Sequence, residues 1–214
     1  MLQLDSVSIN RGNSVIFSNL KATLNTPGLN LIRGKNGSGK TTLLRTIAGF
    51  IPIESGKVIY NRKDITFRKN EWVKKIIYVD NHNGLSEDLT VFENLEAWLN
   101  MKGWSTSKQK VTEALKSLDM DKYSNIYISK CSEGLKKRAA LVRLYFSYIF
   151  EVKFWLLDEP SNGLDQASIL LFKKMITNFL QQNGTIILTT HDKNLFNDKH
   201  NVINLDLLKE LRAK

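Results

Sequence analysis

The chain has 214 residues, enough for one sizeable domain or a core with a subdomain, and its formal net charge is +10. The 42% hydrophobic and 24% charged fractions are typical of a folded protein, and no low-complexity run indicates a long disordered linker. Its single cysteine, Cys131, excludes an internal disulfide framework, and no apolar run is long enough to span a membrane. The basic excess is spread over both halves, which favours a diffusely basic surface over a nucleic-acid-binding tail.

Strand and helix patterns alternate in the first part of the chain. Alternating or continuous apolar residues predict strands over 2–9, 28–34, 56–65 and 74–81. A helix is predicted over 41–50, because apolar residues recur there at helical spacing as far as Phe50.

The pattern then becomes helical from about residue 89 to residue 150. Helices are predicted over 90–103, 107–118 and 135–150. Two apolar strands, 152–160 and 184–192, then flank a helix over 166–184. Strands that alternate with helices indicate an α/β fold with a mainly parallel sheet, into which the central helical block is inserted as a lobe.

A glycine-rich stretch between a predicted strand and a predicted helix matches the phosphate-loop pattern G-x-x-x-x-G-K-[ST]. Glycines allow the backbone to fold closely round a phosphate chain, and the positive helix end adds to the attraction. The ammonium of Lys40 is expected to reach the β- and γ-phosphates, and the Thr41 hydroxyl to bind Mg²⁺. The predicted nucleotide-binding residues here are Gly34, Lys35, Asn36, Gly37, Ser38, Gly39, Lys40, Thr41 and Thr42.

Acidic residues and a histidine follow two later apolar strands. Asp158 ends the strand FWLLD, where its carboxylate is expected to hold the metal, and Glu159 is placed to polarise a water for attack on the γ-phosphate. His191 follows the strand TIILT and is expected at the γ-phosphate edge of the same sheet. Together with Lys40, Glu159 and His191 are the predicted catalytic residues.

The order and spacing of these motifs resemble those of the ATP-binding cassette ATPases over nearly the whole chain. GKNGSGKTT is similar to the Walker A loop, FWLLDEP to the Walker B strand, SNGLD to the D-loop and TTHD to the switch-histidine segment. The resemblance implies a parallel-sheet core of P-loop NTPase type with flanking helices and a small antiparallel β element near the N-terminus. It also implies one domain over 1–214, with the core at about 1–80 and 151–214 and an inserted helical subdomain at about 81–150.

The family signature, usually LSGGQ, reads CSEGL at residues 131–135. Ser132 and Gly134 match, and the resemblance implies that this helix start, like Asp165 of the D-loop, binds nucleotide in a head-to-tail dimer. Glu133 departs from the signature and would place a negative charge near the partner's phosphate. The three cations that follow lie in the first turns of a helix, where the dipole disfavours them, which favours an anion arriving at this end.

Two further positions depart from the family pattern. Asn81 stands at the Q-loop glutamine, so the resemblance implies Asn81 as a nucleotide and Mg²⁺ ligand with a shorter reach. The aromatic residue that stacks on adenine is missing, and Arg11 stands in its place; a guanidinium can also stack on a base.

Within the family, the chain most resembles the ATP-binding subunit of the haem exporter used in cytochrome c maturation, on its small size, the Asn81 region and the segment GLSEDLTVFENLEAWL. The resemblance implies an ATPase that takes ATP and Mg²⁺, dimerises on ATP binding and drives integral membrane subunits. It implies a peripheral location, on the cytoplasmic face of the inner membrane or the matrix face of an organelle. Neither haem nor nucleic acid is expected to bind this subunit.

Three alternatives stay open at this point. The chain could serve another small exporter, act as a soluble switch on nucleic acid or the ribosome, or hydrolyse little ATP. Trp98, Met101 and Trp104 recur at helical spacing, so they either receive a helix of the membrane partner or pack inside the helical lobe.

Overall fold

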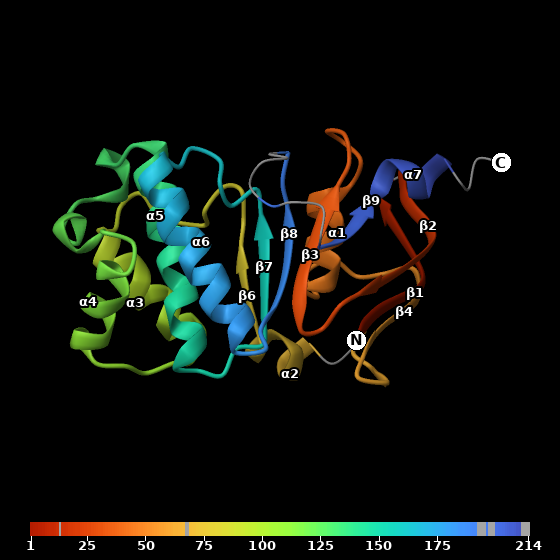
Figure 1. Cartoon of the computed structure of the whole chain (residues 1–214), viewed down its shortest axis with the longest axis horizontal. Helices are drawn as coiled ribbons and strands as arrows, with labels where there is room; N and C mark the ends of the chain where they lie inside the picture. The colour runs from red at the N-terminus through yellow and green to blue at the C-terminus, as the bar shows by residue number, and fades with distance from the viewer. Residues whose placement is uncertain (13, 67–68, 192–195, 197–199, 211–214) are drawn as a thin grey trace.

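Two β-sheets and a group of helices make up the computed structural model, which describes residues 1–12, 14–66, 69–191, 196 and 200–210 (Figure 1). The central sheet has five parallel strands in the order β6-β7-β8-β3-β9. In that order the strands are Ile76–Val79, Phe154–Asp158, Thr185–Thr189, Gly28–Arg33 and Asn201–Asn204. The strands β7 and β8 are buried along their whole length because both faces of the sheet are covered.

A second, antiparallel sheet is built from residues near the N-terminus. Its four strands run in the order β2-β1-β4-β5 and comprise Ser14–Leu24, Leu2–Arg11, Ser55–Tyr60 and Lys63–Asp64. Figure 1 shows this sheet on one side of the parallel sheet and most of the helices on the other, with helix α1 (Lys40–Ile47) between the two sheets.

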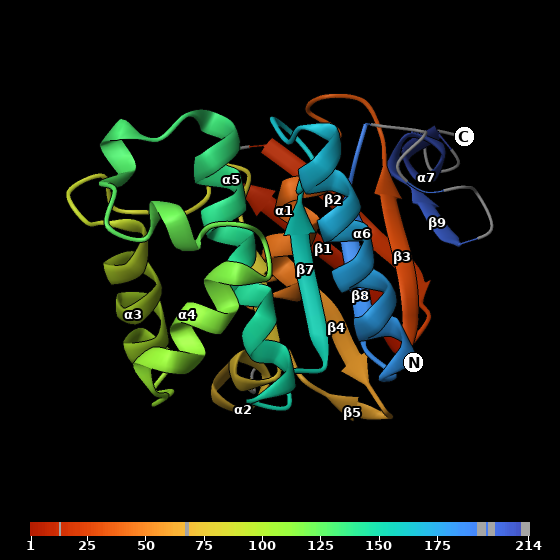
Figure 2. The same ribbon diagram turned by 60° about the vertical axis from the view of Figure 1, so that its left-hand side comes forward.

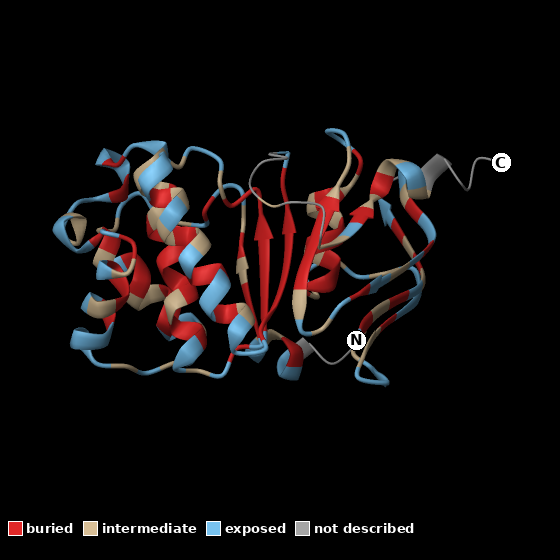
Figure 3. Cartoon of the chain, viewed as in Figure 1, coloured by how far each residue is buried: buried red, intermediate tan, exposed pale blue. Residues whose placement is uncertain are grey.

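Side-chain alternation along the central strands produces two separate cores. Phe154 and Leu156 of β7 join the core shared with α1 and the antiparallel sheet, whereas Trp155 and Leu157 join the core under the helical lobe. The indole of Trp155 stacks on Phe179 with ring centroids 4.1 Å apart. Figure 3 shows these strands as an almost continuous band of buried residues, so the sheet is a rigid support for the loops at its ends.

The helical lobe comprises α3 (Val91–Met101), α4 (Lys108–Lys116), α5 (Glu133–Leu141) and short 3-10 turns (Figure 2). Helix α6 (Gln166–Gln181) packs between this lobe and β8 and β7. Among the described residues, no helix is both long and apolar enough to cross a membrane.

The predicted α/β class, with a parallel core and a small antiparallel element, is confirmed. Several predicted boundaries are wrong. Helix α1 ends at Ile47, since Gly49 takes a left-handed conformation with φ 81°, and Phe50 is exposed. The predicted helix over 135–150 stops at Leu141 and continues as a 3-10 segment, Val142–Tyr148.

Four helices and strands were not predicted from the sequence: β2, β9, α2 (Lys69–Lys74) and α7 (Leu205–Glu210), of which β9 has only four residues. The strand β2 shows no regular alternation of apolar residues, because it lies at the edge of its sheet and has few buried positions. The helices α2 and α7 are each only six residues long, too short for a helical period to stand out.

Candidate nucleotide-binding site

The predicted site residues meet at the carboxyl edge of the parallel sheet. The glycine-rich loop follows β3, the acidic pair ends β7, and His191 follows β8. Asp158 and Thr189 are register partners on adjacent strands, which brings these loops together. They surround a cavity of about 480 Å³ lined by Arg11, Ile16, Asn36, Gly37, Gly39, Lys40, Thr41, Thr42, Asn81, Asp158, Glu159, Asn162 and His191.

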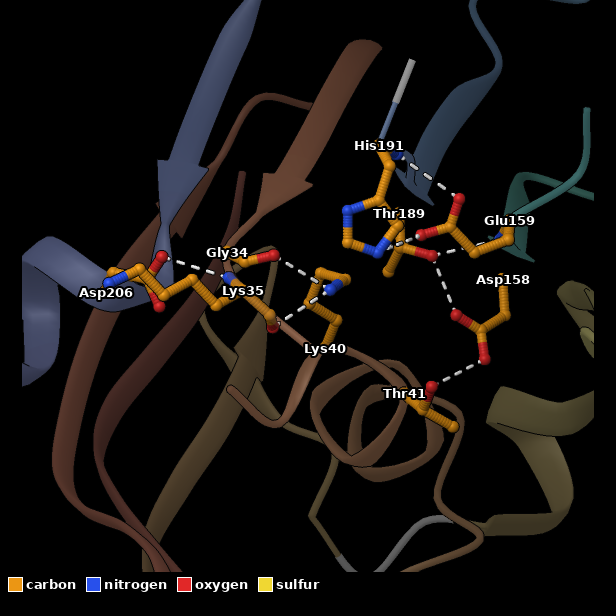
Figure 4. Close-up of polar contacts among 9 residues, drawn as sticks. All are labelled: Gly34, Lys35, Lys40, Thr41, Asp158, Glu159, Thr189, His191 and Asp206. Atoms are coloured by element: carbon orange, nitrogen blue, oxygen red, sulfur yellow. Dashed lines mark hydrogen bonds and ion pairs between the residues drawn. The ribbon is translucent and has the colours of Figure 1, made fainter. Parts of the chain in front are cut away.

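The backbone of the glycine-rich loop leaves no room for a side chain at Gly39. Gly39 has φ 101°, and a Cβ atom there would lie 2.7 Å from Cζ of Phe17. The helix α1 begins directly afterwards at Lys40, so its free N–H groups point to the loop. The buried ammonium of Lys40 donates hydrogen bonds to the carbonyl oxygens of Gly34 (2.9 Å) and Lys35 (3.2 Å), folded across the loop (Figure 4).

Asp158 is the centre of a hydrogen-bond chain across three elements. The Thr41 hydroxyl donates to its Oδ2 and the Thr189 hydroxyl to its Oδ1, each at 2.7 Å (Figure 4). The backbone N–H of Glu159 in turn donates to Oγ1 of Thr189 at 3.0 Å. Since Asp158 is only 2% exposed, these contacts fix its carboxylate beside the first turn of α1.

Glu159 and His191 face each other at the edge of the cavity (Figure 4). The backbone N–H of His191 donates to Oε2 of Glu159 at 3.3 Å, and Nε2 of the ring lies 3.3 Å from Oε1. The latter contact is an ion pair when the imidazole is protonated. Glu159 is 7% exposed, whereas the His191 side chain is 51% exposed, so the ring is accessible from the solvent side.

The cavity also brings in residues from outside the main motifs. Arg11 and Asn81 line it as predicted, although neither belongs to the glycine-rich loop. Ile16 and Asn162 also line the cavity, although neither was a predicted site residue. Ile16 lies on the unpredicted strand β2, and Asn162 belongs to the SNGLD segment. Thr189, the first residue of the TTHD segment, does not line the cavity but holds Asp158 through its hydroxyl.

Gly34, Lys35 and Ser38 belong to the loop but do not line the cavity. The backbone N–H of Lys35 donates to Oδ2 of Asp206 at 3.0 Å, which ties the start of the loop to α7. Asp192, the last residue of the TTHD segment, lies outside the described residues.

Ser132, Gly134 and Asp165 are also absent from the cavity lining. The Ser132 hydroxyl caps α5 by accepting from Leu135 N–H at 3.3 Å. The Asp165 carboxylate caps α6 through Ser168, and these hydrogen bonds lower the pKa of Asp165. At Gly134 a Cβ atom would lie 2.6 Å from the carbonyl oxygen of Gly163, so only glycine lets the helix start pack against the SNGLD segment.

The three cations after this helix start have partners within the chain. Lys136 pairs with Glu87 (3.0 Å) and with Glu133 (3.3 Å). Lys137 is buried and donates to the carbonyl oxygen of Asn81 at 3.1 Å, and burial lowers its pKa. Arg138 lies over the Tyr123 ring. These contacts account for the cations without an arriving anion.

The two tryptophans of the helical lobe, Trp98 and Trp104, pack inside the lobe, which was the second of the two predicted alternatives. Trp98 is buried, and Trp104 packs edge-on to it and stacks on Phe150 with centroids 4.4 Å apart. Met101 is 78% exposed on the same helix. The two indoles are therefore core residues of the lobe.

A glycine-rich loop at a helix start, with a threonine hydroxyl bonded to a strand-end aspartate and a glutamate beside it, defines the class of P-loop NTPases. The comparisons narrow this class. The family model described as ABC transporter matches residues 17–162. The chain belongs to the ABC transporter family, as an ATP-binding ATPase.

Among its relatives are the proteins named cytochrome c biogenesis ATP-binding export protein CcmA. That of Wolbachia pipientis wMel is 34% identical over 191 residues, 89% of each chain. That of Aliivibrio fischeri is 31% identical and covers 94% of this chain and 96% of the relative. That of Pseudomonas aeruginosa is 34% identical and covers 86% of this chain and 89% of the relative.

Solved structures share the fold. A post-hydrolysis dimer of the ATP-binding cassette MJ0796 bound to ADP and Pi superposes with a TM-score of 0.79 at 23% identity, covering 91% of this chain and 90% of that one. An ATP-binding protein of a putative ABC transporter from Pyrococcus furiosus has a TM-score of 0.76 at 22% identity, covering 96% and 98%.

Proposed function

We propose that this chain is the ATP-hydrolysing subunit of a membrane exporter in cytochrome c biogenesis, with haem as the cargo of the membrane subunits. The observation that carries the ATPase part is the cavity in which Lys40, Thr41, Asp158, Glu159 and His191 converge. Support for the exporter part is the set of CcmA relatives, which align along about nine-tenths of the chain.

Nucleotide binding uses the loop and the start of α1. The β- and γ-phosphates lie against the backbone N–H groups of the loop, and Lys40 exchanges its two carbonyl acceptors for phosphate oxygens. The Arg11 guanidinium and the Ile16 side chain line the same cavity and provide a stacking face and an apolar contact for the base.

The donor set next to the phosphates fits Mg²⁺. Thr41 Oγ1 and Asp158 Oδ2 are hard oxygen donors 2.7 Å apart, and the amide of Asn81 lines the same cavity. Thr41, Asp158 and Asn81 would hold the metal. When bound, Mg²⁺ neutralises charge on the β- and γ-phosphate oxygens.

Hydrolysis transfers the γ-phosphoryl group to water. The oxygen of the water attacks the γ-phosphorus, the bond from that phosphorus to the β–γ bridging oxygen breaks, and ADP leaves. Glu159 orients the water and takes its proton, and His191 contacts the γ-phosphate and holds the Glu159 carboxylate.

Ser132, Gly134 and Asp165 act on the nucleotide of a second copy of the chain. They lie outside the cavity of their own chain, and the close contact of Gly134 with Gly163 holds the signature and D-loop segments together. A head-to-tail dimer formed on ATP binding therefore places both segments against the partner's phosphates.

The membrane subunits dock in a groove of about 440 Å³ between the sheet core and the helical lobe. Phe50 is 53% exposed there, Ile51 lies beside it, and the ion pair of Arg45 with Asp80 lines the same groove. Asn83 also lines the groove; it is 6% exposed, and its Oδ1 accepts no hydrogen bond from the described part of the chain. The end of a docked helix offers a hydrogen-bond donor to that oxygen. Docked in this way, the chain is a peripheral subunit on the cytoplasmic or matrix face of the membrane.

The partner is tested by purifying the chain from membranes in mild detergent and identifying the proteins that come with it. Integral membrane subunits of cytochrome c maturation are expected. Ribosomes or nucleic acid in their place would overturn the exporter assignment in favour of a soluble switch.

The chemistry is tested with Glu159→Gln. Without its proton acceptor the variant should lose activity by roughly 10²- to 10⁴-fold. It should keep ATP affinity and accumulate an ATP-bound dimer, measured by light scattering with ATP and Mg²⁺. Glu71→Gln, an exposed change on α2 at the opposite end of the sheet, is the matched control. A Glu159→Gln protein that stays monomeric with ATP would contradict the shared site.

A further inference from the structure

The loop after β6, residues 80–84, is held by cations from three separate elements. Arg45 reaches it from α1, Lys137 from α5 and Arg143 from the 3-10 segment that follows. Both Lys137 and Arg143 are almost fully buried, at 3% and 6% exposed. Burying two cations is costly unless each has defined partners, so their bonds to this loop stabilise one conformation of it.

Lys137 makes its bond at the end of the loop nearest the nucleotide cavity. Its Nζ donates to the carbonyl oxygen of Asn81 at 3.1 Å. Asn81 lines the nucleotide cavity, whereas the Lys137 side chain does not, so the lysine holds this wall of the cavity from behind.

Arg143 holds the other end of the same loop. Its guanidinium donates to the carbonyl oxygens of Asn83 (3.0 Å) and Gly84 (2.7 Å), and all three residues line the docking groove instead of the nucleotide cavity. Lys137 therefore holds the part of the loop that lines the nucleotide cavity, and Arg143 holds the part that lines the docking groove.

We propose that Lys137 is a positioning residue of the nucleotide site, which holds the backbone of Asn81 inward so that its amide reaches the bound metal. An asparagine side chain is one methylene shorter than a glutamine, so its reach depends on where the backbone is held. The inference rests on the proposed function, because it requires Mg²⁺ and ATP in this cavity.

Equilibrium binding of ATP, with Mg²⁺ and with EDTA, tests this role in Lys137→Met, Lys137→Arg, Asn81→Ala and the double variant Lys137→Met/Asn81→Ala. Lys137→Met should weaken binding in Mg²⁺ by roughly tenfold or more and leave binding in EDTA unchanged. Lys137→Arg should restore most of the loss. Asn81→Ala should show a similar loss, and the double variant should lose no more than either single variant.

A second measurement uses the protein without nucleotide. Amide hydrogen exchange at residues 80–84 should be faster in Lys137→Met than in wild type, while exchange at residues 34–42 stays the same. Lys174→Met, an exposed change on α6, is the control for loss of one positive charge. Should Lys137→Met not fold, as judged by circular dichroism, Lys137→Gln takes its place.

Equal losses in Mg²⁺ and EDTA, additive effects of the two substitutions, or unchanged binding would each overturn the role of Lys137. Wild-type protein that binds no ATP in Mg²⁺ would instead overturn the proposed function, so the two failures are distinguishable.

Discussion

Asp80 shows how a single carboxylate connects two parts of the site. Its Oδ2 binds the Arg45 guanidinium of α1 at 2.7 Å, and its Oδ1 accepts from the backbone N–H of His82 at 3.1 Å. Burial would raise the pKa of Asp80, but the hydrogen bonds from His82 and Arg45 outweigh this and lower it. The helix that carries the phosphate loop is thereby tied to the loop that carries Asn81.

A lowered pKa makes this contribution dependent on pH. Because the carboxylate is held charged in the folded state, its stabilisation is present above the unfolded pKa of about 4 and is lost as the pH falls through the folded pKa. Asp80→Asn should lower the free energy of unfolding by about 1 kcal/mol or less at pH 7, since the pair is partly exposed. The difference from wild type, measured by urea unfolding, should close below about pH 4.

The matched control for this experiment is Asp88→Asn, an exposed carboxylate elsewhere in the chain. The free energy of unfolding of Asp88→Asn should differ little from that of wild type across the same pH range. A gap between the unfolding free energies of wild type and Asp80→Asn that does not narrow as the pH falls below about 4 would show that the charge of Asp80 is not the source of the stabilisation.

At the scale of an element, helix α3 begins with a complete capping box. The Thr90 hydroxyl accepts from the backbone N–H of Glu93 at 3.2 Å, and Oε2 of Glu93 accepts from the backbone N–H of Thr90 at 2.8 Å. These bonds satisfy N–H groups that have no partner inside the helix. They fix where the helical lobe starts after the Asn81 loop.

Thr90→Ala should therefore lower the free energy of unfolding by about 1 kcal/mol. Thr112→Ala, in the exposed interior of α4, is the control and should stay within about 0.5 kcal/mol of wild type. Thermal and urea unfolding measure both. Equal effects of the two substitutions would mean that the cap does not hold the lobe.

At the scale of the whole molecule, the docking groove lies where binding of a partner can affect binding of nucleotide. It is lined by Arg45 from the phosphate-loop helix and by Asn83 and Gly84 from the loop that also carries Asn81. A partner seated there contacts both segments that hold the nucleotide site, so docking and nucleotide binding act on the same elements.

Phe50→Glu should prevent co-purification with the membrane subunits, because it places a charge at the exposed apolar part of the groove. Leu170→Glu is the matched control, since Leu170 is 68% exposed on α6 and does not line the groove. Circular dichroism checks that both variants fold. Full recovery of the membrane subunits with Phe50→Glu would rule out this docking surface.

The sequence alone predicted the class of fold and most of the residues that line the nucleotide cavity. The phosphate loop, the Asp158–Glu159 pair and His191 each follow an apolar strand, and parallel strands end at the same edge of a sheet. Local patterns therefore predicted both the class of fold and the residues that converge.

The tertiary structure decided what depends on contacts between distant segments. The burial of Lys137 against Asn81, the approach of Gly134 to Gly163, and the place of Ile16 in the cavity each join segments far apart in the chain. A lysine at the start of a helix has the same local pattern whether it meets solvent or a buried carbonyl. Only the packing of α5 against the loop after β6 separates those outcomes, because burial and hydrogen-bond partners are properties of the folded chain.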